Sequence, residues 1–286
     1  MEEWPEDERL VQRAARHQER FGPRGLLTRR IQMYFEIEGS SVRLGGTMHR
    51  VPKGHSLASW THDAITWARV IYLEHDKHES DQGRFAPPGS LPIARRLPRS
   101  WPRIDCKFPR HRVVQLAMQR PSAVASDVMD LVPTDEGVER LAIARSQETQ
   151  PPGPCIKYLE TPAESYASED GVSDAVWDAA VSWALDNPGS FKTVLEAAYI
   201  AWVAGDFEEV GRISTLHGLS RFPEIKHAVI TARNYLWLPT IRELVQSANE
   251  PTLVLVGVAH LGGPDGLVPQ LTAGGLTLTT VARAYG

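Results

Sequence analysis

The 286-residue chain contains very little cysteine and no long apolar segment. Its two cysteines, Cys106 and Cys155, are too few for a disulfide framework or a cysteine-based zinc site. No run approaches the roughly 18 apolar residues of a membrane-spanning helix. The acidic first residues, Met-Glu-Glu-Trp-Pro-Glu-Asp-Glu-Arg, are unlike a secretory signal. These absences predict a protein of the reducing cytoplasm with no membrane span.

The chain also lacks an excess of positive charge. Its 31 Lys and Arg residues face 35 Asp and Glu residues, which gives a formal net charge of −4. A protein that binds nucleic acid over a broad surface is basic, so no nucleic-acid partner is expected. Hydrophobic residues make up 42% of the chain and charged residues 23%, which predicts an ordinary globular protein with a sizeable core.

Two short segments share one design, in which a strand-like run leads to a glycine and, three residues later, a histidine. The first is Gly-Thr-Met-His at 46–49, and the second is Gly-Val-Ala-His at 257–260. Glycine at the end of a strand lets the backbone turn sharply or approach a ligand closely. A histidine there faces the crevice at the carboxyl ends of strands, where open α/β sheets bind ligands. The repetition predicts one site built from two half-sites.

The N-terminal pattern predicts a hairpin followed by a β-α-β unit. Residues 34–38 and 41–44 alternate polar and apolar side chains around a glycine, as in a β-hairpin. Ser56 can cap a helix whose apolar residues recur at helical spacing. The apolar run 70–73 then forms a short buried strand that ends at Glu74. Strand, helix and strand within about 30 residues predict parallel strands.

The C-terminal pattern completes the same sheet. Residues 252–258 are apolar, as expected of a strand covered on both faces, and 276–282 form the last strand. We therefore predict an α/β (α+β) fold: a mixed, largely parallel central sheet formed by the N- and C-terminal halves, with a large helical insertion. The expected parts are a charged extension (1–30) and a single domain (31–286) that comprises a first unit (31–76), a Pro/Arg-rich flap (77–135), a helical insertion (173–247) and a second unit (251–286).

Side chains at the ends of the predicted strands suit a divalent metal. His49 and His260 offer neutral imidazoles and Glu74 a carboxylate, a set that can leave a position open for a water whose pKa falls to about 7. Glu160, at the end of another strand-like run, is a second candidate ligand or general base. Arg233 begins a helix-like stretch and can neutralise an oxyanion or clamp a carboxylate. Histidines after strands are often only hydrogen-bonded in loops, so spacing alone leaves the metal and the reaction undecided.

These residues resemble those of a known family. The chain is similar to the TraB/GumN/Tiki superfamily (TraB/PrgY-like), and more distantly to erythromycin esterase-like and ChaN-like proteins. The segment from Gly257 to Leu267 is the most specific part of the resemblance. The matching pieces span about residues 32–283 and comprise 46–49, 72–76, 137–139, 158–160, 201–206, 233–234 and 257–267.

The resemblance implies an α+β core with one active centre and a metal-dependent protease activity like that of Tiki proteins, which use manganese or cobalt. It assigns the paired histidine roles to His49 and His260, the first-strand carboxylate to Glu74 and the helix arginine to Arg233. Glu160 matches a later strand-end glutamate. The chain departs from the family in its lack of an export signal and in its basic, Pro-rich segment 84–112, so the substrate class is not inherited.

The sequence therefore predicts a metal-dependent hydrolase, with a peptidase favoured over an esterase. His49, His260 and Glu74 would bind Mn, Co or Zn, Glu160 would act as ligand or base, and Arg233 would steady the transition state. The expected partner is a peptide or small-molecule substrate. Two alternatives keep the same centre: a macrolide-type esterase, and a non-catalytic protein that binds a peptide, a metal or, less in keeping with the pattern, haem.

Overall fold

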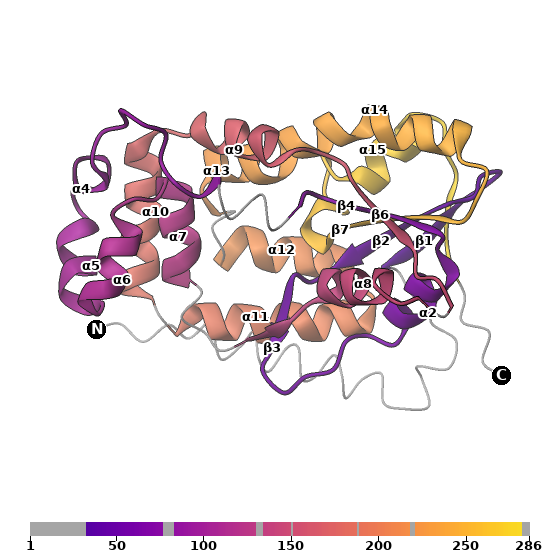
Figure 1. Cartoon of the computed structure of the whole chain (residues 1–286), viewed down its shortest axis with the longest axis horizontal. Coiled ribbons are helices and arrows are strands. Elements are labelled where there is room, and N and C mark those ends of the chain that lie inside the picture. Colours follow the sequence, from indigo (N-terminus) through magenta and orange to yellow (C-terminus); the bar gives the residue numbers. More distant parts are fainter. Residues whose placement is uncertain are drawn as a thin grey trace.

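The computed structural model describes residues 33–76, 83–129, 134–149, 151–187, 189–217 and 221–281 (Figure 1). The charged extension predicted at 1–30 lies outside these residues. Within them, the chain forms a mixed α/β fold around a six-stranded sheet ordered β6-β4-β7-β2-β1-β8, which confirms the predicted fold class. The strands are β1 (Tyr34–Ile37), β2 (Val42–Thr47), β4 (Val70–Leu73), β6 (Cys155–Tyr158), β7 (Thr252–Gly257) and β8 (Leu278–Thr280).

The sheet is parallel where the two ends of the chain meet. β7 pairs in parallel with β2 on one side and with β4 on the other, and β4 pairs in parallel with β6. The register sets Thr47 opposite Gly257, so the two Gly-x-x-His segments leave the sheet side by side. The second segment then enters a short 3₁₀ turn, Val258–His260. β1 and β8 extend the sheet in the antiparallel sense beyond β2.

The composition of β7 explains its central position. All of its residues are buried, and a strand covered on both faces needs apolar, β-branched side chains of this kind. One apolar core joins the strands to helices on both faces of the sheet. In Figure 1, α14 (Ala232–Ser247) and α15 (Leu267–Ala273) lie above the strands, and α2 (Trp60–Trp67), α8 (Val138–Ser146) and α11 (Ser190–Ala204) lie below them.

The segment interpreted from the sequence as a Pro/Arg-rich flap is helical over most of its described part. Pro121 begins a helix rather than breaking one, because the first turn of a helix needs no N–H from proline. Two of its arginines pair with acidic residues of the insertion: Arg96 lies 2.8 Å from Asp174, and Arg103 lies 2.5 Å from Asp186. The elements are α4 (Ile93–Arg96), α5 (Trp101–Lys107), α6 (Arg110–Leu116), α7 (Pro121–Met129) and β5 (Thr134–Glu136), which pairs with β3 (Arg50–Pro52).

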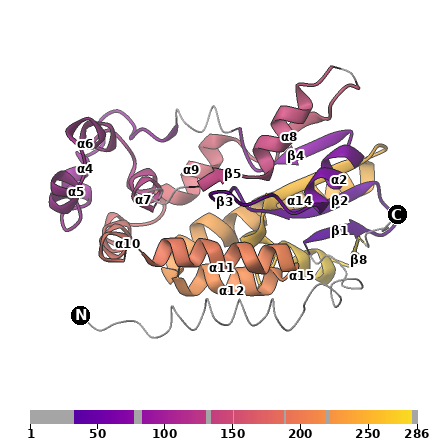
Figure 2. The ribbon, with the colours of Figure 1, turned by 90° about the horizontal axis from the view of Figure 1, so that it is seen from below.

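The helical insertion ends in one long helix built from three parts. α13 continues through a π-helical turn into α14, so the helix that carries Arg233 begins at Pro223, well before the predicted start. α10 packs with α4 to α7 around a second apolar core, and α11 lies beside α12 (Figure 2). In the described ranges, no helix is both long and apolar enough to cross a lipid bilayer. The remaining bounds are α9 (Pro162–Asp170), α10 (Asp174–Asp186), α12 (Phe207–His217), α13 (Pro223–Lys226) and the π-helical turn (His227–Thr231).

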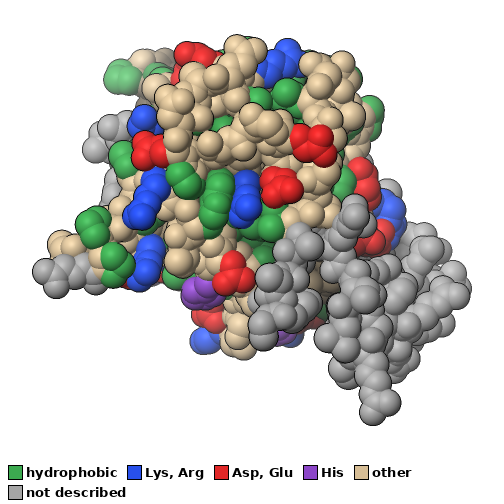
Figure 3. Space-filling model, turned by 90° about the vertical axis from the view of Figure 1, so that its right-hand side faces the viewer, with side chains coloured by type: hydrophobic (Ala, Val, Ile, Leu, Met, Phe, Trp, Pro, Cys, Tyr) green, Lys and Arg blue, Asp and Glu red, His purple; other side chains and the backbone are tan. Residues whose placement is uncertain are grey.

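The face at the right of Figure 1 mixes charges of both signs. Side chains of Lys and Arg lie among those of Asp and Glu and among apolar side chains (Figure 3). Protein surfaces that bind nucleic acid concentrate positive charge. On this face, positive and negative side chains are interspersed instead. That no nucleic acid binds the protein stays a prediction.

Candidate active site

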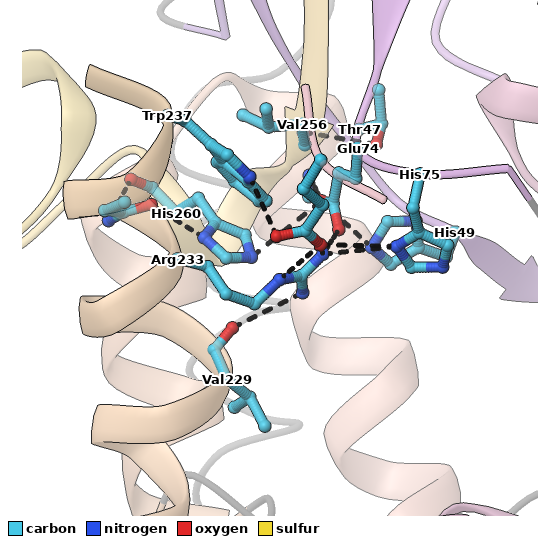
Figure 4. A network of polar contacts seen from close by, with 12 residues as sticks. Thr47, His49, Glu74, His75, Val229, Arg233, Trp237, Val256 and His260 are labelled. Carbon is cyan, nitrogen blue, oxygen red and sulfur yellow. Dashed lines mark hydrogen bonds and ion pairs between the residues drawn. The ribbon is translucent and has the colours of Figure 1, made fainter. Parts of the chain in front are cut away.

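The side chains predicted from the sequence to form a site meet at the carboxyl edge of the sheet (Figure 4). Glu74 follows β4, His49 follows β2 and His260 closes the 3₁₀ turn after β7. Glu160 comes just after β6, and Arg233 projects from the first turn of α14. The structure thus brings both histidines, both carboxylates and the arginine into one network of polar contacts.

Glu74 is the hub of this network, with a side chain that is only 5% exposed. Its Oε1 accepts a hydrogen bond from the backbone N–H of Gly257 at 2.6 Å. The same oxygen lies 3.5 Å from Nε2 of His49 and 3.8 Å from Nε2 of His260. Its Oε2 accepts a hydrogen bond from Nη2 of Arg233 at 2.7 Å. Glu74 therefore stands between the two half-sites and touches both.

Gly257 is required for close approach rather than for an unusual backbone conformation. A Cβ atom at this position would lie 2.8 Å from Nε2 of His49 and 3.3 Å from Oε1 of Glu74. Real Cβ atoms essentially never come within 3.0 Å of another atom, so a side chain at this position would push the His49 ring away from the carboxylate. The motif glycine keeps this space open.

Arg233 balances the two buried carboxylates. Its Nε and Nη2 donate to Oε1 of Glu160 at 2.9 and 2.5 Å, and Nη1 reaches the carbonyl of Val229 in the π-helical turn at 3.5 Å. Burial opposes the ionisation of Glu74, but Arg233, followed by the two histidines, lowers its pKa well below the usual range. Burial likewise opposes the ionisation of Glu160, whose pKa is lowered by the contacts with His75 and Arg233. Both acids are therefore carboxylates at neutral pH.

His260 is held as a neutral ring with a known tautomer. Asn234 donates through Nδ2 to the carbonyls of His260 and Asp265, at 3.2 and 2.8 Å. Its Oδ1 must then accept, so Nδ1 of His260, 2.7 Å away, carries the proton. Burial lowers the pKa of His260 to about 3. Its Nε2 therefore presents a lone pair toward Glu74.

His49 has a carboxylate behind it instead of an amide. Its Nδ1 lies 3.0 Å from Oε1 of Glu139, which also accepts a hydrogen bond from Thr47. Desolvation lowers the pKa of His49, but Glu139 and Glu74 outweigh it and raise the pKa to about 9. The side chain is 56% exposed, so water screens part of this attraction. A carboxylate on Nδ1 orients Nε2 toward the site, as it does for many metal-binding histidines.

Two residues of the site, Glu139 and Asn234, have no role predicted from the sequence. Glu139 reaches His49 because Gly137 starts α8 directly against the first motif, where its N–H donates to the carbonyl of His49 at 3.0 Å. The available signals are position in the segment 137–139 for Glu139 and adjacency to Arg233 for Asn234. Trp237 is distinguished from the other tryptophans by its spacing of one helical turn from Arg233.

The donor atoms suit a divalent metal in type. Nε2 of His49 and Nε2 of His260 each lie within 3.8 Å of Oε1 of Glu74, and both Nδ1 atoms have other partners. Imidazole nitrogen and carboxylate oxygen are the usual ligands of zinc and manganese. Across the described residues, no three His, Cys, Asp or Glu side chains already form a group arranged to hold a metal ion. The residues therefore fit a metal chemically, although Glu74 is shared with Arg233.

Comparison with known proteins identifies the family. A family model described as TraB/PrgY/gumN family matches residues 112–280, more than half of the chain. This range contains Glu160, Arg233 and His260; His49 and Glu74 lie before it and join the site through the pairing of β2 and β4 with β7. Comparisons with curated proteins and with solved structures gave no match. The chain belongs to the TraB/PrgY/gumN family.

Proposed function

We propose that this protein is a metal-dependent hydrolase that acts on peptide bonds. The observation that supports this function is the convergence of His49 Nε2, His260 Nε2 and Glu74 Oε1 at the sheet edge, with both Nδ1 atoms engaged elsewhere. These residues would hold Mn²⁺, Co²⁺ or Zn²⁺. Such an ion, when bound, polarises a carbonyl and lowers the pKa of a bound water.

Glu160 is proposed to act as the general base. Its lowered pKa keeps it ionised at neutral pH, and one of its contacts with Arg233 or Trp237 would have to open before it accepts a proton from an attacking water. Nδ1 of His75 lies 3.5 Å from its Oε1, a contact that helps to keep the carboxylate ionised. The His75 side chain beside this buried carboxylate is 25% exposed.

Arg233 is proposed to offset negative charge that develops on the substrate carbonyl oxygen. A guanidinium already held by two carboxylates needs no reorganisation when that charge appears. The exposed side of the site is that of His49, whereas His260, Glu74, Glu160 and Arg233 are buried. The substrate would therefore approach from the His49 side.

The function is tested by hydrolysis with defined metals. Purified protein is stripped with a chelator, reloaded separately with Mn²⁺, Co²⁺ or Zn²⁺, and incubated with a peptide library and a panel of esters, with cleavage followed by mass spectrometry. We expect metal-dependent peptide cleavage that is lost in His49→Ala and in His260→Ala. His62→Ala, which removes an exposed histidine of α2, is the matched control and should keep full activity.

The same experiment separates the alternatives. Cleavage of esters without peptides would replace the peptidase by an esterase that uses the same centre. Saturable binding of a peptide or metal without turnover, or a Soret absorbance band after addition of haem, would replace the enzyme by a binding protein. Activity that survives both histidine substitutions would refute the site itself.

A further inference from the structure

Trp237 makes three contacts inside the site. It lies one helical turn after Arg233 on α14 and is fully buried, at 0% exposure. Its indole N–H donates to Oε2 of Glu160 at 3.0 Å. Cζ of Arg233 lies 4.7 Å from the centre of its ring, and the His260 ring lies 4.6 Å away with an interplanar angle of 44° (Figure 4). One side chain thus touches the proposed base, the arginine and a motif histidine.

The indole N–H controls the orientation of the Glu160 carboxylate. Arg233 binds only Oε1 of this carboxylate, and Trp237 binds Oε2. Two donors on different oxygens fix the rotation of the carboxylate plane, which one donor cannot do. The Glu160 side chain is 0% exposed, so without the indole its Oε2 would be left unpaired away from water.

The ring of Trp237 acts on the other two residues. A guanidinium over an indole face is attracted to the ring and loses freedom to move away from its carboxylates. The same ring packs against His260 and covers it from solvent.

We propose that Trp237 is a positioning residue of this site: its N–H aims the Glu160 carboxylate, and its ring holds the Arg233 guanidinium and shields His260. The effect on rate rests on the proposed hydrolase function. The contact between Trp237 and Glu160 does not, and it can be measured without turnover.

The contact is tested by NMR of the indole N–H groups in ¹⁵N-labelled protein. The Trp237 signal is assigned by its loss in Trp237→Phe. We expect Glu160→Gln, and independently Glu160→Asp, to shift this signal strongly, because a neutral or shorter acceptor weakens the hydrogen bond. Trp177 is the matched reference, since its N–H donates to a backbone carbonyl, that of Glu169, at 3.4 Å. A Trp237 signal that moves no more than that of Trp177 overturns the proposal.

The effect on rate is tested with Trp237→Phe, which keeps an aromatic ring and deletes the N–H. We expect kcat to fall about tenfold with little change in KM, as for loss of one hydrogen bond to a charged group. Trp177→Phe should leave kcat unchanged at equal thermal stability. Glu160→Gln combined with Trp237→Phe should lose no more than Glu160→Gln alone, because the indole acts through that carboxylate.

A fall in kcat no larger than that of Trp177→Phe, or losses that simply add in the double variant, would overturn the positioning role. Failure of the parent protein to hydrolyse any substrate would instead refute the proposed function. In that event the NMR measurement still decides whether Trp237 holds Glu160.

Discussion

The two Gly-x-x-His segments have the same spacing but opposite surroundings. His49 has a side chain that is 56% exposed, a carboxylate behind Nδ1 and a pKa raised to about 9. His260 is 3% exposed, has an amide behind Nδ1 and has a pKa lowered to about 3. The motif therefore fixes where each imidazole stands, whereas burial and the partner of Nδ1 decide whether it carries a charge.

The difference follows from what comes next in the chain. After His49 the chain continues into β3, and α8 brings Glu139 to the ring. His260 instead lies in a 3₁₀ turn against α12 and α14, where Asn234 and Trp237 enclose it. At neutral pH one half-site therefore holds a proton and the other a lone pair, with Glu74 between them.

The largest expected effect on stability comes from removing Arg233, which pairs with both buried carboxylates. Arg233→Ala leaves Glu74 and Glu160 as buried carboxylates without their common partner. Breaking a buried ion pair on one side costs roughly 3–5 kcal/mol of unfolding free energy. Urea denaturation monitored by circular dichroism measures this loss. A loss below about 1 kcal/mol, as for exposed pairs, would contradict the buried network.

Replacing Asn234, the hydrogen-bond partner of His260, should make the surroundings of the two motif histidines more alike. Asn234→Asp places a carboxylate behind Nδ1, as Glu139 does for His49, and an adjacent opposite charge raises a histidine pKa by about 1–3 units. NMR titration of the imidazole Cε1–H signal measures the change. Asn234→Ala is the control, since it removes the same amide without adding charge. An equal pKa in both variants would show that burial alone sets the His260 ring.

The affinity for a metal ion should depend on pH, because His49 is protonated at neutral pH. A cation that binds Nε2 of His49 must displace that proton, so the affinity should rise with pH by up to tenfold per unit below about pH 9. Calorimetry of Mn²⁺ or Zn²⁺ binding in buffers of different ionisation enthalpy counts the protons released. An affinity that does not change between neutral and alkaline pH would remove His49 from the ligand set.

The smallest expected effect comes from removing the charge of Glu139, which lies beside Nδ1 of His49. Glu139→Gln should lower the His49 pKa by about one unit, because Glu74 remains. The folded-state pKa of about 9 lies above the unfolded value near 6.5, so the proton stabilises the fold fully below that lower value. This contribution is lost as the pH rises through about 9.

Urea midpoints measured at several pH values on both sides of this window would show the loss. In Glu139→Gln the loss should begin near the same pH as in the parent protein, but it should be smaller and be complete at a lower pH. Identical pH dependence of the two proteins would mean that Glu139 does not govern the protonation of His49.

The sheet and the main site residues could be predicted because their signals are local. The buried run of β7 and the hairpin of β1 and β2 follow from apolar periodicity, and parallel strand ends must meet at one edge. Once those strands are assigned, His49, His260, Glu74 and Glu160 are carried to that edge by chain geometry. Their proposed catalytic roles stay predictions.

The surrounding partners could not be predicted because they depend on packing between distant elements. No feature of the sequence near His49 predicts that Glu139, 90 positions later, contacts its ring. Proline in the 83–129 region resembles a helix breaker until the helix starts are known, as Pro121 illustrates. The π-helical turn before Arg233 likewise has no marker in composition.

The place of β7 between β2 and β4 has a consequence for how the protein is made. Both neighbours are synthesised early, whereas β7 emerges from the ribosome near the end of translation. Until it inserts, the nascent chain has a gap through the middle of its sheet, and Glu74 and His49 have no third member to meet. Contacts of such long sequence separation also form slowly. The candidate site should therefore be the last part of the molecule to assemble, and a polypeptide that ends before β7 should lack it.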